Sequence, residues 1–142
     1  MKRVAIVVAV AGVCLGACAP MPTGGGGGIT ASPCNNGVCK VSVDVTNCVI
    51  TLNPDPLYVS GANNIFWELN FMSSLYRFPD DGIKLKTPSS EFDGPESQGS
   101  KFKLHDKNTK AGSYPYAVKV QRWVMFQWTD CPPLDPTIVN GS

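Results

Sequence analysis

Val41-Ser42-Val43-Asp44-Val45 decides the fold, because its three valines alternate with two polar residues. A strand places successive side chains on opposite faces, so this period of two predicts a half-buried β-strand. A second stretch, Asn64–Asn70 (NIFWELN), alternates in the same way and puts Ile65, Trp67 and Leu69 on one side. No stretch has a convincing helical period, so the sequence predicts an all-β protein.

Shorter apolar or β-branched runs lie at residues 48–52, 57–59, 76–78, 83–86, 101–104, 114–120 and 122–128. Pro, Gly, Asn and Asp, which favour turns, separate most of them. Thr87–Ser100 is expected to be a long loop. About seven to nine short strands with turns between them predict an antiparallel Greek-key β-sandwich. The core candidates are large apolar and aromatic side chains: Trp67, Phe102, Leu104, Tyr114, Tyr116 and Trp123.

Residues 1–17 have the pattern of a secretory signal peptide. Two basic residues precede an uncharged apolar run that is shorter than the ~20 residues needed to span a bilayer. The run ends in Leu15-Gly16-Ala17-Cys18, which resembles the lipobox of bacterial lipoproteins. The resemblance implies that Cys18 carries a lipid, becomes the new N-terminus and anchors the chain in a membrane. The alternative is an ordinary signal peptide cut nearby, for example after Ala19, with Cys18 discarded.

Residues 18–33 follow as the lipidated cysteine and a flexible tether. The segment contains a run of five glycines and no charge, so it cannot bury enough apolar surface to offset its ordering entropy. Ala19, rather than aspartate, follows the cysteine, which by resemblance to the enterobacterial sorting rule implies the outer membrane. Residues 34–142 are expected to form one β-sandwich domain, which we expect to face the periplasm.

The exported part keeps four further cysteines, and an even number in an oxidising compartment predicts two disulfides. Four cysteines allow three pairings. An Asn-Gly turn signal between Cys34 and Cys39 favours a local bridge, which leaves Cys48 and Cys131 as a long-range pair. A zinc site is the alternative, but Cys48 and Cys131 are isolated in the sequence and the chain has one histidine.

Two segments resemble the cupredoxin family. Leu57–Trp67 (LYVSGANNIFW) is similar to the opening strands of that family, and Gly112–Val118 (GSYPYAV) resembles the entry to its copper loop. The resemblance implies a cupredoxin-like or immunoglobulin-like sandwich. Val118 stands where the copper cysteine would be, so it implies a domain without the copper ligands. Phe102–Asn108 is also similar to a motif of proteobacterial lipoproteins.

Several function classes are disfavoured. Loss of Lys2 and Arg3 with the signal peptide takes the formal net charge from +1 to −1, and a nearly neutral domain offers no electrostatic footprint for nucleic acid. His105-Asp106 is the one histidine–carboxylate neighbour pair, but adjacent residues on a strand point to opposite faces, so a structural histidine is favoured over catalysis. We therefore expect no enzyme and no cofactor. The acidic residues available for calcium lack EF-hand spacing: Asp80, Asp81, Glu91, Asp93 and Glu96.

The favoured function is a lipid-anchored, non-enzymatic binding or structural module of the bacterial cell envelope. Its partner is an envelope protein or a small ligand, contacted through Asn70–Leu75, Pro79–Gly82 or Thr87–Ser100, since loops on a rigid scaffold usually carry binding. The alternative is a periplasmic metal-handling or redox protein using the following residues: His105, Met72 or Met125.

One further surface is open to two interpretations. Trp123, Phe126 and Trp128 either form an exposed aromatic ligand surface or pack in the core, and core packing is favoured.

Overall fold

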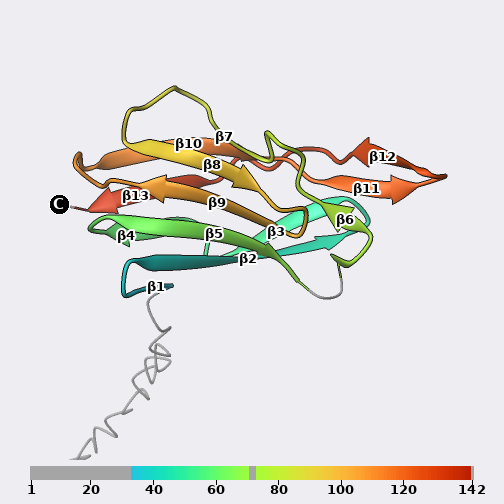
Figure 1. Cartoon of the computed structure of the whole chain (residues 1–142), viewed down its shortest axis with the longest axis horizontal. Helices are drawn as coiled ribbons and strands as arrows, with labels where there is room; N and C mark the ends of the chain where they lie inside the picture. Colours follow the sequence, from blue (N-terminus) through green and yellow to red (C-terminus); the bar gives the residue numbers. More distant parts are fainter. Residues whose placement is uncertain (1–32, 71–72, 142) are drawn as a thin grey trace, which may run out of the picture.

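The computed structural model describes residues 33–70 and 73–141. Within these residues the chain forms thirteen strands and no α-helix, which confirms the all-β class. The strands belong to two larger sheets and one small sheet, shown in Figure 1. Residues 1–32, which include the expected lipidation site Cys18, and Met72 lie outside the described residues, so the predictions made for them stay predictions.

The first sheet has the order β1-β2-β5-β9-β8, and β3 also pairs with β2. Its strands are β1 (Cys34–Asn35), β2 (Val38–Thr46), β3 (Val49–Asn53), β5 (Asn63–Leu69), β8 (Phe92–Ser97) and β9 (Lys101–Asp106). The second sheet, in the order β4-β13-β10-β7, contains β4 (Leu57–Ser60), β7 (Ile83–Leu85), β10 (Gly112–Val118) and β13 (Thr137–Gly141). The third, in the order β12-β11-β6, contains β6 (Tyr76–Arg77), β11 (Gln121–Val124) and β12 (Gln127–Asp130).

The two larger sheets share one hydrophobic core, an arrangement consistent with a β-sandwich. Trp67 on β5 and Tyr116 on β10 meet across it, with ring centroids 5.5 Å apart in an edge-on arrangement. The indole Nε1 of Trp67 donates a hydrogen bond to the Tyr116 hydroxyl over 3.1 Å, so neither buried polar group is left without a partner. Phe102 and Leu104 are also buried as expected, and Tyr114 packs against the core.

The prediction of purely antiparallel sheets is wrong. Eight strand pairings are antiparallel, but β2 runs parallel to β5 and β4 runs parallel to β13. An alternating pattern shows which face of a strand is buried, whereas it contains no information on the direction of the neighbouring strand. The direction of the neighbouring strand depends on how the chain connects the two strands. Here the parallel pairs β2–β5 and β4–β13 bring together segments that are distant in the sequence.

Three segments differ from the sequence prediction. The expected loop Thr87–Ser100 contains β8, which the pattern hides because Phe92 is its one buried side chain. The run 122–128 is two strands joined by a turn at Met125 and Phe126, not one strand. A further strand, β13, follows Cys131 and pairs with both β4 and β10, whereas the last run indicated by the sequence was 122–128.

The structure contains both expected disulfides. Cys34–Cys39 joins neighbouring strands of the β1–β2 hairpin, whose turn is Asn36-Gly37. Cys48–Cys131 joins residues 83 positions apart in sequence and connects the β2–β3 turn to the residue after β12. The bridge therefore attaches the third sheet covalently to the first sheet, at the residue that follows β12.

Candidate functional site

The β11–β12 hairpin projects beyond the two larger sheets at one end of the long axis (Figure 1). The short strand β1, where the described chain begins, lies toward the other end of the same axis. Among the described strands, β6 alone pairs with the hairpin, through Gln121 with Arg77 and Arg122 with Tyr76. No described strand therefore lies beside the outer part of the hairpin.

The tip of this hairpin exposes large apolar side chains. Met125 is 88% exposed and Phe126 is 93% exposed, and Val124 beside them is 37% exposed. Met125 and Phe126 are the two turn residues, and both have a positive φ, of 48° and 64°. Residues other than glycine adopt positive φ at an energetic cost. Met125 and Phe126 therefore occupy a backbone conformation that is unfavourable for them.

Two other hairpins of the same chain show what such a turn usually contains. The β1–β2 turn uses Asn36-Gly37, the favoured pair for two residues of positive φ. The β2–β3 turn uses Asn47-Cys48, where the cysteine forms the disulfide to Cys131. Cysteine thus stands at the position where glycine is favoured because it forms this disulfide. Met125 and Phe126 have no comparable use inside the described molecule, because both point into solvent.

Behind the tip lies a stack of aromatic and cationic groups. Trp123 and Trp128 face each other across the two strands, with ring centroids 5.0 Å apart. The guanidinium of Arg77 lies over the Trp128 ring at 4.3 Å. Leu75 and Ser74 border the pair and complete a mostly apolar depression of about 350 Å³. Trp123 is 40% exposed, so its expected place in the core is wrong: no sheet formed by residues 33–70 and 73–141 covers this face of the hairpin.

The two arginines of this sheet have no acidic partner among the described residues. All four salt bridges found there use lysines: Lys86 with Asp135, Lys101 with Glu68, Lys107 with Asp93 and Lys119 with Asp81. Arg77 instead donates to the side chain of Gln121 over 3.0 Å, and Nε of Arg122 has no hydrogen-bond partner. The hairpin therefore combines an apolar tip, a tryptophan pair and unpaired positive charge at its base.

Replacing the tip by the favoured turn pair is expected to stabilise the protein. In the double variant Met125→Asn/Phe126→Gly, the free energy of unfolding should rise by about 1 kcal/mol, because the strain of positive φ is relieved. Little packing is lost, since both side chains are exposed. Chemical denaturation measures the change, and Tyr58→Asn, at an exposed position of extended backbone, serves as control. A less stable double variant would show that the tip contributes to folding.

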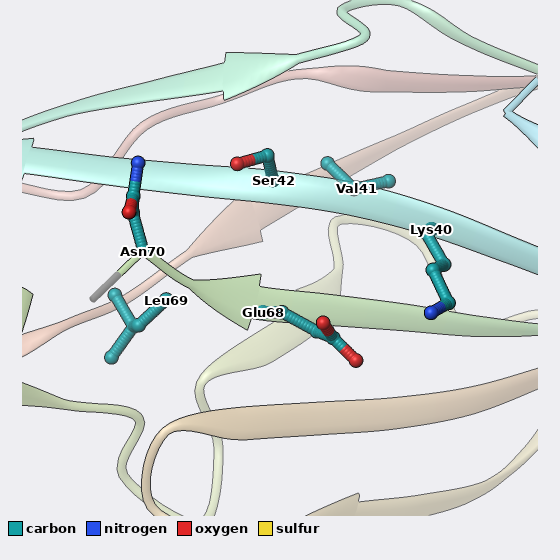
Figure 2. Close-up of a pocket in the computed structure, with 6 residues that line it drawn as sticks. All are labelled: Lys40, Val41, Ser42, Glu68, Leu69 and Asn70. Atoms are coloured by element: carbon teal, nitrogen blue, oxygen red, sulfur yellow. The ribbon is translucent and has the colours of Figure 1, made fainter.

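A second depression, of about 400 Å³, lies on the first sheet. Figure 2 shows that its six residues follow β2 and the end of β5 along the sheet surface, without enclosing a hollow. Two of its polar side chains are already engaged: Glu68 accepts from Lys101 at 3.0 Å, and Asn70 donates to Asp44 at 2.7 Å. We therefore do not assign a ligand to this surface.

The histidine–carboxylate pair lies in a polar network and does not form a catalytic dyad. His105 Nδ1 is 3.3 Å from the side-chain oxygen of Asn64. Asp106 is completely buried and accepts hydrogen bonds from the Asn108 amide (2.9 Å) and from Asn140 Nδ2 (3.0 Å). Burial raises the pKa of the Asp106 carboxyl, because desolvation disfavours its charged form.

Three of the acidic residues considered for calcium, Glu91, Asp81 and Asp93, have internal partners. Glu91 accepts from the Thr109 hydroxyl at 2.6 Å and from the amides of Thr109 and Lys110, and these hydrogen bonds lower its pKa. Asp81 and Asp93 form ion pairs with lysines, and the hydrogen bond from Lys119 lowers the pKa of Asp81. Across residues 33–70 and 73–141, no three His, Cys, Asp or Glu side chains are grouped so as to hold a metal ion.

The two described residues of the redox alternative, His105 and Met125, do not come together. His105 lies near the end of β9, and Met125 lies in the β11–β12 turn, at the opposite end of the long axis (Figure 1). Val118 is fully buried in the core and pairs with Ile83, as expected for a packing residue. The part of the chain that is described has no helix of the length and apolar character that crossing a membrane requires.

Of the three loops expected to contact a partner, only the end of Asn70–Leu75 reaches the candidate site. The Trp123 amide donates to the Leu75 carbonyl over 2.8 Å, and Leu75 is itself exposed. Sequence reasoning missed Val124 and Met125 as surface residues. A signal was present in Trp123–Trp128 (WVMFQW), where two tryptophans flank four residues as in a hairpin pair, but no Gly, Asn or Pro marks the turn.

Comparison with known proteins adds no functional assignment. No family model matches this sequence, and no curated protein matches it significantly.

Proposed function

We propose that this protein is an exported, lipid-anchored, non-enzymatic binding module of the bacterial cell envelope, and that the β11–β12 tip is its contact surface. The observation that carries the proposal is the exposure of Met125 and Phe126 in a turn of unfavourable backbone conformation. Exposed apolar groups that are held against local preference are typical of binding sites. The tryptophan pair and the Cys48–Cys131 bridge make the base of the hairpin rigid.

The export and lipid anchor belong to the same proposal. The Leu15–Cys18 motif supports lipidation of Cys18, and the absence of Asp after it supports the outer membrane, with the domain in the periplasm. The two disulfides fit an oxidising compartment. We also propose that the fold is of the cupredoxin-like or immunoglobulin-like Greek-key type. Support for this comes from the Leu57–Trp67 and Gly112–Val118 resemblances and from the two packed sheets.

Metabolic labelling tests the anchor. In bacteria that express the full chain, a palmitate analogue should label the wild-type protein, and Cys18→Ser should abolish the label because the acylated thiol is gone. Fractionation should find the wild type in the outer membrane. Cys14→Ser is the matched control, since Cys14 lies inside the segment expected to be removed, and its label should be unchanged. A soluble, unlabelled wild type would contradict the proposal.

A further inference from the structure

We propose that the occupant of the β11–β12 tip is a lipid bilayer, into whose interface Met125 and Phe126 insert. The inference rests on the proposed function, because the anchor on Cys18 is what holds the domain beside a membrane. A convex tip of two large apolar side chains is suited to a fluid surface, which needs no preformed pocket to receive it. The run Trp123–Trp128 (WVMFQW) contains no charged residue that would have to leave water on insertion.

The order of residues along the hairpin matches the layers of a membrane interface. Met125 and Phe126 form the tip, and the Trp123–Trp128 pair lies two residues behind them, or about 7 Å along the strands. Tryptophan is enriched at the boundary between hydrocarbon and headgroups. Apolar faces of peripheral membrane proteins are typically buried to a depth of about 5–10 Å. Insertion of the tip to this depth would place both indoles at the headgroup level.

Two arginines lie beside and behind the tryptophan pair, as seen from the tip. Arg122 lies one residue further from the tip than Trp123, and Arg77 stacks on Trp128. Neither arginine forms a salt bridge within residues 33–70 and 73–141, so no acidic side chain there neutralises the charge with which a lipid phosphate would pair. The one acid on the hairpin, Asp130, is at its base and accepts from Gln121 over 2.8 Å. The charge pattern is therefore complementary to an anionic headgroup layer.

The position of the hairpin also allows its tip to contact a bilayer at some distance from the anchor. The hairpin projects from the end of the molecule that is distant from β1 (Figure 1). In the sequence, residues 18–33 lie between the proposed anchor and β1. A glycine-rich tether of this length spans roughly 20 Å on average. The domain can therefore turn until the tip meets a bilayer. Insertion would fix its orientation, because the anchor and the hairpin would hold it at two separate points.

Photo-crosslinking in living cells tests the occupant with the full chain. One variant carries Phe126→p-benzoylphenylalanine, and the matched control carries Tyr58→p-benzoylphenylalanine on β4, where Tyr58 is 63% exposed. We expect irradiation to add phospholipid mass to the peptide that contains position 126 and not to the one that contains position 58. A protein adduct at position 126 would overturn the bilayer assignment and leave the proposed function standing. No adduct at position 126, in a protein that palmitate labels, would overturn both the bilayer assignment and the tip as contact surface.

A reconstitution measurement provides an independent check. The lipidated full-length protein is placed in vesicles of phosphatidylethanolamine and phosphatidylglycerol with brominated acyl chains, which quench nearby tryptophan. Wild-type emission should be quenched, and the Met125→Asn/Phe126→Gly variant should lose that quenching. Trp67, which is buried in the core, supplies an unquenched reference in both proteins. Equal quenching of the two proteins would overturn the insertion of the tip.

Discussion

Removal of the Cys48–Cys131 bridge by Cys48→Ser/Cys131→Ser is expected to lower the free energy of unfolding by about 4 kcal/mol. The bridge closes a loop between residues 83 positions apart, so its loss gives the unfolded chain much conformational freedom. In the folded protein it also connects the β2–β3 turn to the base of the third sheet. Chemical denaturation under non-reducing conditions measures the change in stability.

The other disulfide provides the matched control. Cys34 and Cys39 are five positions apart, and the same chain-entropy argument gives about 2 kcal/mol for Cys34→Ser/Cys39→Ser. Hydrogen exchange separates the local effects, because only loss of Cys48–Cys131 should raise the exchange of the β11–β12 amides. Equal destabilisation by the two double variants, with unchanged exchange in the hairpin, would show that the long-range bridge does not support the site.

Asp106→Ala is expected to lower the free energy of unfolding by about 3 kcal/mol, because one buried donor and one part-buried donor lose their acceptor. These donors are the Asn108 amide and Asn140 Nδ2, which tie the end of β9 to the following loop and to β13. Asp106→Asn is the matched variant, since its side-chain oxygen still accepts both hydrogen bonds and it introduces no charge. At about pH 7 it should be at least as stable as wild type.

The pH dependence follows from the raised pKa of Asp106. Burial disfavours the charged carboxylate, so the folded protein binds this proton more tightly than the unfolded chain does. Stability from this group is therefore fully present below its ordinary pKa and is lost as pH rises through the folded value. The advantage of Asp106→Asn over wild type should shrink as pH falls. Denaturation of both proteins across acidic and neutral pH measures it, and a growing advantage on acidification would contradict the argument.

The local pattern was enough to predict much of the fold. Val41, Val43, Ile65 and Trp67 are all buried on the faces that alternation assigned to them, because a period of two follows from strand geometry alone. The Asn36-Gly37 turn likewise predicted the local Cys34–Cys39 bridge, since it reverses the chain between the two cysteines. The remaining pair, Cys48–Cys131, then followed from the even number of cysteines.

The candidate site depended on tertiary structure. Trp67 and Trp123 lie in similar apolar runs, yet Trp67 is fully buried and Trp123 is 40% exposed. The difference is that β5 lies opposite β10 of the second sheet, whereas β11 and β12 extend past the end of both larger sheets. The parallel pairing of β4 with β13 was equally absent from the local pattern. A sequence specifies which side of a strand is apolar, but only the packing of distant strands determines whether another sheet covers that side or leaves it to solvent.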